Sequence, residues 1–511
     1  ADALEGELSI MLVDDIMVAS IGEAPLSEML DNINAGASAF AGTELHGHLT
    51  SNYDLGTEVL TAVNLSALLT LANDAPVDPA DAEAVEGFYE GMEIVGLKNA
   101  DYLIAQYQQD NGDMNLTATE GDLSVSQSSS LTAGNDLTGS AGANLAFTTG
   151  ASVDAGGDLD LDAGNHLSVE DATVRADGDA ALTATDGNLT VARAPVTAGG
   201  FLDGDAGQGI ILTAATLNSG QHHGVRRLAP LADDNVDLTL NAGSGDIALS
   251  QGSTVESAGA LTLDSEQGNV SLTQSSRATA VTDATVEAGA GVSLAGSSRL
   301  EATNGDLDVT AIGGDFTARE GSVLRSGGDF TGSAGADLAF TAGAQADADG
   351  DLDLDAGDNL TVQNATVRAD GDAALTATDG DLAVTRSSVT AGGFLDGDAG
   401  AAIILTTANL TSGILGTSPD LTLNAGSGDV TLTDGSRASS AGALTLGSEE
   451  GSIVLTNNSR ACVAHVHHAA VLNVGVVAAT GICVLLFPHL VAVGKMISLV
   501  LPTCLSAPVS M

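Results

Sequence analysis

The chain has 511 residues, with 68 acidic and 14 basic side chains and a formal net charge of −54. It is 44% hydrophobic but only 3% aromatic, and it contains 63 glycines, 9 prolines and no tryptophan. The aliphatic content excludes a disordered chain, the scarcity of proline excludes a collagen-like one, and the acidity makes nucleic acid an unsuitable partner. A thin, regular and repetitive structure fits this composition.

Residues 1–111 predict a small mixed α/β domain. An aspartate precedes a proline at Asp78–Pro79, a pattern typical of a helix start, and it predicts a helix over Ala80–Val95. Pro25–Ile33 predicts a shorter helix, and the apolar run Leu60–Ala72 suits either a strand or a helix. We expect this domain to cap one end of the region that follows and to block edge-to-edge growth.

Residues 112–461 form a regular repeat. Glycines recur at a nearly constant spacing, at Gly112, Gly134, Gly157, Gly178 and Gly200. Apolar residues alternate between them, so that Leu159 and Leu161 share one face of an extended segment and Asp160 lies on the other. We therefore predict an all-β fold, a right-handed parallel β-helix (β-solenoid) of about 16 coils of ~22 residues with a thin aliphatic core.

The repeat region also contains a long duplication. Residues 134–278 recur as 327–461, and Ala172–Gly187 recurs unchanged at an offset of 193. The connection Gln221–Val236 of the first copy is longer than its counterpart in the second. The extra length is too short for a whole coil, so we expect this connection to project from the solenoid as a loop.

This loop is the first candidate binding site. It contains the only basic cluster of an acidic repeat region, formed by His222, His223, Arg226 and Arg227. Projecting loops are where recognition residues often lie. The alternative is a neutral surface insertion, because lengthening a loop costs little free energy.

Two related segments are candidate calcium sites. The segment from Asp203 to Gly207 and its copy from Asp396 to Gly400 resemble a calcium-binding loop. The carboxylates that would bind the ion are Asp203, Asp205, Asp396 and Asp398. The third acidic ligand and the distal glutamate of an EF-hand are absent, so a solvated acidic turn is the alternative. No other cofactor is expected.

Residues 462–511 differ from everything before them. They contain no Asp or Glu, and the match between the two copies stops after Ala461. Ala469–Phe487 carries no charge and is close to the length of about 20 residues that a helix needs to cross a bilayer. The tail is a C-terminal membrane anchor, a non-native end produced by a reading-frame accident, or a buried terminal cap.

The glycine-opened segments Gly121–Val125, Gly187–Val191 and Gly305–Val309 resemble filamentous-haemagglutinin-type repeats of large bacterial exoproteins and adhesins. The resemblance covers residues 112–461. It implies a rod displayed at the bacterial cell surface or released outside the cell, where it mediates adhesion or biofilm contact. Its partners would be cell-surface glycans or proteins, or other copies of itself, with membrane contact only through residues 469–487.

We therefore expect a structural and adhesive protein and not an enzyme. The alternatives are a β-helical polysaccharide lyase or hydrolase and a self-associating matrix or surface-layer component. Arg175 near Asp177 and Arg368 near Asp370 occupy duplicated positions, which favours structural ion pairs over a unique active site. Aromatic side chains for stacking sugars are also scarce.

Overall fold

A computed structural model describes residues 8–13, 16–21, 59–64, 102–108, 112–220, 236–413 and 419–463. These ranges contain strands and turns but no helix. The helices predicted over 25–33 and 80–95 lie outside the described residues, as does the tail after Val463.

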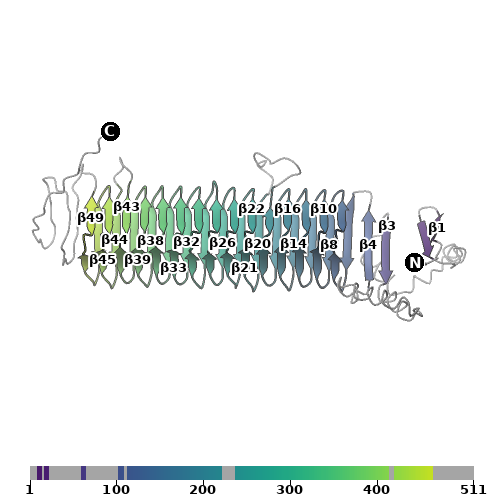
Figure 1. The fold of residues 1–511 in the computed structure, drawn as a ribbon, viewed down its shortest axis with the longest axis horizontal. Helices are drawn as coiled ribbons and strands as arrows, with labels where there is room; N and C mark the ends of the chain where they lie inside the picture. The colour runs from purple at the N-terminus through teal and green to yellow at the C-terminus, as the bar shows by residue number, and fades with distance from the viewer. Residues whose placement is uncertain are drawn as a thin grey trace, which may run out of the picture.

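The repeat region is a parallel β-solenoid, seen in Figure 1 as a long rod of stacked coils. Each coil gives one strand to each of three sheets. The first coil contains β5 (Asp113–Ala118), β6 (Leu123–Val125) and β7 (Ser130–Ala133). The last contains β47 (Leu444–Ser448), β48 (Ile453–Leu455) and β49 (Arg460–Val463). We name the sheets by their first strands: sheet 1 starts at β5, sheet 2 at β6 and sheet 3 at β7.

The predicted fold class is confirmed, and the coil number is slightly lower than predicted. Sheets 2 and 3 each have 15 strands, so the described rod has 15 coils. The prediction of about 16 divided the whole repeat region by the period. Two connections, 221–235 and 414–418, lie between coils and are together about as long as one coil.

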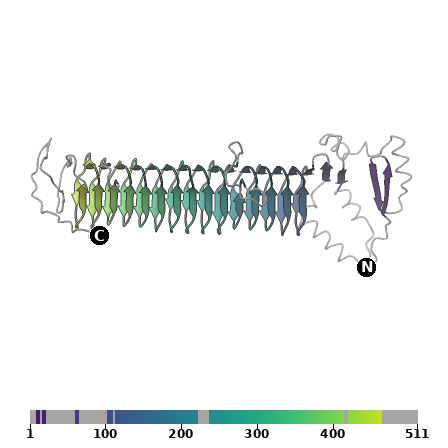
Figure 2. The same cartoon turned by 90° about the horizontal axis from the view of Figure 1, so that it is seen from above.

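Neighbouring coils pair in register, so the same position of each coil forms a straight row along the rod. Figure 2 shows these rows from a second side. In β11 (Leu159–Ala163), Leu161 pairs with Gly139 of the previous coil and with Leu182 of the next. The inward positions predicted from the period of two are all buried: Leu159, Leu161, Leu167, Val169, Val174, Leu182, Leu189, Val191 and Val196.

The core is filled mainly by Leu, Val, Ile and Ala, with a few phenylalanines. Phe147, Phe316, Phe330 and Phe340 are fully buried. The rings of Phe316 and Phe340 meet edge to face with centroids 5.7 Å apart. Small aliphatic side chains suit this core because each coil encloses little space between its three strands.

Strands from the N-terminal region cover the first edge of sheet 1. β3 (Val59–Asn64) pairs antiparallel with β4 (Tyr102–Gln108), and β4 pairs antiparallel with β5. The apolar run from Leu60 therefore begins as a strand. A separate hairpin joins β1 (Leu8–Val13) to β2 (Ile16–Ile21). β4 occupies the hydrogen-bonding edge of β5, so the outermost described strand of sheet 1 on this side is β3.

In the described ranges, every non-glycine residue with a positive φ lies in the turn from sheet 2 to sheet 3. Asp171 (φ 48°) and Arg193 (φ 51°) form single-residue examples, and Gln274 and Ser275 form a longer one. The left-handed conformation costs about 1–2 kcal/mol for a non-glycine residue. In the longer turn a buried serine offsets part of this cost, because Ser276 Oγ donates to the Thr273 carbonyl at 2.6 Å.

No helix in the described part of the chain is long and apolar enough to cross a membrane. The predicted anchor, residues 469–487, lies outside that part.

Candidate functional site: the outer faces of the rod

Many of the repeated aspartates accept hydrogen bonds from backbone N–H groups. In the turn from sheet 3 to sheet 1, Asp306 Oδ1 accepts a hydrogen bond from the Asp329 N–H at 2.8 Å. Asp329 Oδ1 accepts from the Asp351 N–H at 2.8 Å, and Asp351 Oδ1 accepts from the Asp372 N–H at 2.7 Å. Each carboxylate thus satisfies a backbone donor of the next coil, so these aspartates form a structural ladder along one corner.

The glycine period follows from this ladder. A Cβ added at Gly350 would collide with Asp329 Oδ1, and a Cβ at Gly371 would collide with Asp351 Oδ1. Only glycine leaves room for the carboxylate of the preceding coil. The recurring Gly-Asp pair is therefore a packing requirement of the corner.

A second ladder follows the corner from sheet 1 to sheet 2 and contains a histidine. Asn144 Oδ1 accepts from the His166 N–H at 3.2 Å. His166 Nδ1 accepts from the Asn188 N–H at 2.9 Å, and Asn188 Oδ1 accepts from the Gly209 N–H at 2.9 Å. His166 thus takes the place of an asparagine, and its Nδ1 is a backbone acceptor.

The outer face of sheet 1 is acidic. From β8 (Leu137–Ala141) to β47, its strands contain no Arg, Lys or His. They carry eleven outward carboxylates: Asp160, Asp162, Asp203, Asp205, Asp264, Glu287, Asp308, Asp353, Asp355, Asp396 and Asp398. Eight of these form four Asp-x-Asp pairs. Within each pair, burial and then the charge of the second carboxylate raise the pKa of the first, namely Asp160, Asp203, Asp353 and Asp396.

The four predicted calcium ligands belong to these pairs and lie on strands. Asp203 and Asp205 project outward from β17 (Leu202–Ala206), and Asp396 and Asp398 project outward from β41 (Leu395–Ala399). The interpretation of these segments as turns is wrong. Gly204 points inward beneath Leu240, where an added Cβ would lie 2.7 Å from Leu240 Cδ2. The alternation of buried and outward positions therefore decides the conformation, despite the turn-forming residue types.

The two candidate calcium segments lie far apart. β17 and β41 are separated by eight coil steps, roughly 38 Å at the strand spacing of a sheet. Within the described ranges, no group of three or more His, Cys, Asp or Glu side chains is arranged to hold a metal ion. Calcium binding at either pair stays a prediction.

Sheet 3 carries the basic side chains. The described residues include ten arginines, all of them on strands of sheet 3 or in the turns that lead into those strands. Seven lie on the strands: Arg175, Arg277, Arg299, Arg325, Arg368, Arg437 and Arg460. Arg193, Arg319 and Arg386 lie in the turns. The net charge of the rod is therefore distributed unevenly around its axis.

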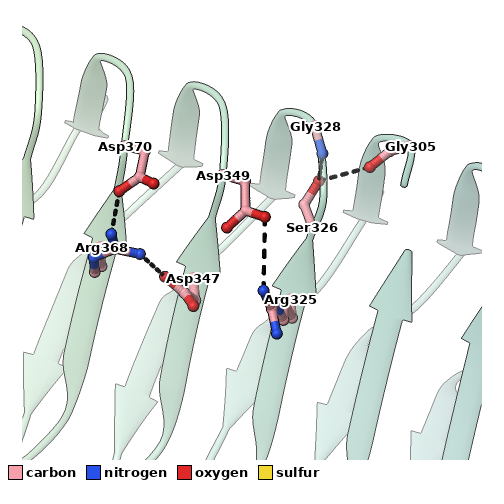
Figure 3. A network of polar contacts seen from close by, with 8 residues as sticks. All are labelled: Gly305, Arg325, Ser326, Gly328, Asp347, Asp349, Arg368 and Asp370. Atoms are coloured by element: carbon pink, nitrogen blue, oxygen red, sulfur yellow. Dashed lines mark hydrogen bonds and ion pairs between the residues drawn. The ribbon is translucent and has the colours of Figure 1, made fainter. Parts of the chain in front are cut away.

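The duplicated arginines make ion pairs between and within coils, as predicted. Figure 3 shows Arg368 between Asp347, which it meets at 2.8 Å, and Asp370. Arg325 pairs with Asp349 at 3.6 Å. In the first copy Arg175 contacts Asp154 at 3.1 Å and also pairs with Asp177. The same geometry thus occurs in both copies, as expected for structural pairs.

A partly buried acid lies at the middle of sheet 3. Arg299 Nε donates to Glu301 Oε2 at 2.7 Å, and the Glu301 side chain is only 14% exposed. This hydrogen bond, together with the charges of Arg325 and Arg277, lowers the pKa of Glu301. Arg277 is the in-register neighbour of Arg299 in the previous coil and is itself exposed. Arg277 and Arg299 are one of two in-register arginine pairs on the described strands of sheet 3, and Arg437 and Arg460 are the other.

The outer face of sheet 2 is almost uncharged. Across its 15 strands, Glu170 is the only charged residue. The other outward residues are mostly Ser, Thr and Ala. Three are larger aliphatic residues: Ile211 on β18 (Ile210–Thr213), Ile404 on β42 (Ile403–Thr406) and Val454 on β48, and Ile211 is 39% exposed. The rod thus has three chemically different faces: acidic, uncharged and mixed.

The predicted basic loop lies outside the described residues, so the structure does not place His222, His223, Arg226 or Arg227. The residues on either side of it are described. Buried Ser219 and Ser257 donate to the Val236 carbonyl at 2.6 and 3.2 Å. In the second copy, Ser412 and Ser440 donate to the Pro419 carbonyl at 3.3 and 2.9 Å. The residues that follow the two connections are therefore held by equivalent pairs of serines.

The described surface has one shallow depression of note. Its lining includes Asp205, Asn241, Asp264 and Thr183 of sheet 1, and Glu266 in the adjoining turn to sheet 2. Asn241 Nδ2 donates to Asp205 Oδ1 at 2.8 Å. No basic side chain lines this depression, so the convergence of carboxylates with Arg or Lys expected for cleavage of a polysaccharide is missing from its lining.

These residues define an acidic parallel β-solenoid with chemically distinct faces, a class whose fold is consistent with a structural rod or with a β-helical enzyme. Comparison of the chain with protein-family models, with curated proteins and with solved structures found no match.

The sequence alone did not reveal the two ladders, the buried serines or the separation of charge among the faces. These features depend on which residues occupy equivalent positions in neighbouring coils. They can be recognised only when residues one coil apart are aligned row by row.

Proposed function

We propose that this chain is a structural rod, exposed at a bacterial surface or secreted, that makes adhesive contacts with cells, a host or a biofilm. One observation carries the proposal: acidic, uncharged and arginine-bearing faces each run the length of 15 in-register coils. A repeated face offers many equivalent weak contacts, and linked weak contacts produce avidity. The partners would be cell-surface glycans or proteins.

Sheet 3 is the face that we expect to meet acidic glycans or proteins. Its arginines are the basic groups of the described rod, and Arg277 and Arg299 lie in neighbouring coils. Guanidinium groups bind carboxylates with good geometry. The acidic face of sheet 1 would repel the same partners, so contact would be confined to one side of the rod.

Adhesion can be tested by displaying the full chain on a non-adherent bacterium and measuring attachment to cells and to glycan-coated surfaces. Replacing Arg277 and Arg299 by Glu should weaken attachment. Replacing Thr262 and Thr285 by Glu makes a control on the outer face of sheet 1, in the same two coils. Attachment no greater than that of cells without the chain would contradict the proposal.

The loop can be tested with a replacement that the chain itself supplies. Exchanging residues 221–235 for residues 414–418 replaces the long connection by the short one of the second copy. Because both connections rejoin through equivalent serines, the coil should stay closed. Loss of attachment would assign recognition to His222, His223, Arg226 and Arg227, and unchanged attachment would leave the strands of sheet 3 as the adhesive face.

The alternative is a β-helical polysaccharide lyase or hydrolase, and the depression on sheet 1 is where it would act. Asp205 and Asp264 line it from two coils that are separated by one other. Sugar-release assays on acidic polysaccharides test this alternative. Turnover that disappears in Asp264→Asn would replace the adhesive proposal by an enzymatic one.

A further inference from the structure

The uncharged face of sheet 2 stands out on a chain with a net charge of −54. Two such rods repel each other through most of their surface. The strands of sheet 2 present a single charged residue, Glu170, so the strands of two copies meeting through this face oppose almost no like charges, and the aspartates of the flanking turns lie at its edges. The acidic side chains of sheet 1 project from a different side of the coil.

This face is large enough for a stable pair. Fifteen strands of three or four residues, at about 4.8 Å between strands and about 3.3 Å per residue, give roughly 72 by 12 Å. The contact would bury about 900 Å² per copy, or about 1,800 Å² in total, which lies in the size range of specific interfaces. The rows run straight along the rod (Figure 2), so contact can continue along its length.

The two outward isoleucines define a register. Ile211 on β18 and Ile404 on β42 both occupy the second position of their strands. In sheet 2, β18 lies four strands before β30 (Phe316–Ala318) and β42 lies four strands after it. A two-fold axis through β30 would therefore place Ile211 of one copy opposite Ile404 of the other, twice in each pair.

We infer that two copies of this chain pair antiparallel through the outer faces of sheet 2, with Ile211 of one copy packed against Ile404 of the other. Two-fold pairing brings the same patch of both copies together, the commonest arrangement among homo-oligomers. The same axis places the strand of Glu170 opposite β48 of the last coil, whose outward residue is Val454, and keeps Glu170 away from its own counterpart. Side chains of Ser, Thr and Ala let the two flat sheets approach closely.

This pairing extends the proposed function by naming another copy as one partner. It is measured on purified protein without cells or glycans, so its failure is distinguishable from a failure of adhesion.

The first test is sedimentation of the full chain over a range of concentrations. We expect a dimer whose dissociation constant rises at least tenfold when Ile211 and Ile404 are both replaced by Lys. The matched control replaces Thr216 and Asn409 by Lys, which adds the same charge to the same two coils on sheet 3 and should leave the dimer intact. A monomeric wild-type chain, or equal effects of the two double variants, would overturn the inference.

The second test is the register. In a background with Cys462, Cys483 and Cys504 replaced by Ser, a mixture of Ile211→Cys and Ile404→Cys chains should form a disulfide-linked pair under mild oxidation. Each variant alone should not, because antiparallel pairing separates like positions by about eight coil steps. Cross-linking of Ile211→Cys with itself would show parallel pairing and overturn the antiparallel register. Binding of an uncharged polysaccharide to a monomeric chain, abolished by the two lysines, would assign the face to a carbohydrate instead.

Discussion

The Oδ1 atom of Asp329 lies 2.8 Å from the backbone nitrogen of Asp351, one coil further along the rod. The carboxylate provides the acceptor for this backbone N–H. No neighbouring strand provides one at this corner, because the chain is turning between sheets. The same contact recurs from coil to coil, so the charge of the rod is partly a by-product of its hydrogen bonding.

Asp329→Ala should therefore destabilise the rod by about 1 kcal/mol, the typical net value of one hydrogen bond. Asp329→Asn keeps a carbonyl oxygen as acceptor and should stay close to the wild type. Hydrogen exchange at the Asp351 amide, with chemical unfolding of the whole chain, measures both effects. If the Asp351 amide exchanged equally fast in the Ala and Asn variants, and faster than in the wild type, the charge of Asp329 and not its acceptor oxygen would be what protects the amide.

Gly350→Ala should cost about 1–3 kcal/mol, because its Cβ would collide with Asp329 Oδ1. The same substitution in an Asp329→Ala background should cost less, since the nearest colliding atom is gone and only the 2.9 Å contacts with the Gly328 carbonyl remain. A double-mutant cycle measured by chemical unfolding gives the coupling between the two positions. Strict additivity would contradict the explanation of the glycine period.

Stability should rise when the first carboxylates of the Asp-x-Asp pairs are neutralised. Burial, followed by the charges of Asp205 and Asp398, raises the pKa values of Asp203 and Asp396. A raised carboxyl pKa favours folding while the group is protonated, and that contribution is lost as the pH rises through the folded-state value.

Replacing Asp203 and Asp396 together by Asn should therefore raise the Tm at neutral pH. The gain in the free energy of unfolding should be less than about 1 kcal/mol per site, because solvent screens both groups. It should disappear on acidification below the unfolded-state pKa. Asp308→Asn, which removes an outward carboxylate that has Thr310 in place of a paired Asp, is the control. A gain that is the same at every pH would refute this account.

The two copies of the arginine pair should differ in their contribution to stability. The Arg368 side chain is 45% exposed and the Arg175 side chain is 18% exposed. Arg368→Gln should cost less than about 1 kcal/mol, and the cost should shrink further in about 1 M NaCl, where charges are screened beyond roughly 3 Å. Arg175→Gln should cost more and depend less on salt. Thermal unfolding at two salt concentrations decides between this expectation and equal contributions.

The fold was predictable because its main signal is local. Leu159 and Leu161 alternate with aspartates inside one strand, and this period is visible without knowing what the strand pairs with. The coil number was less accessible, since residues 221–235 and 414–418 lengthen the chain without adding a coil.

The site was less predictable because it depends on contacts between coils. Gly204 flanked by two aspartates suggests a turn, yet pairing with Leu240 in the next coil makes it an inward strand position. Nothing in the local sequence distinguishes Ser257 and Ser440 from other polar residues. Their role depends on hydrogen bonds to the carbonyls of Val236 and Pro419, which only the fold brings beside them. The separation of the arginines onto sheet 3 likewise requires the register, which the approximate repeat period does not define to the single residue.

The serine pairs that close the two connections have a practical consequence. The corner from sheet 3 to sheet 1 accepts the long connection 221–235 in one copy and the short connection 414–418 in the other, without any change in the register of the neighbouring strands. It is therefore a natural attachment point for foreign peptides or labels. The two positions lie on the same corner about eight coil steps apart, roughly 38 Å, so the rod would hold a pair of inserted probes at a fixed separation like marks on a ruler.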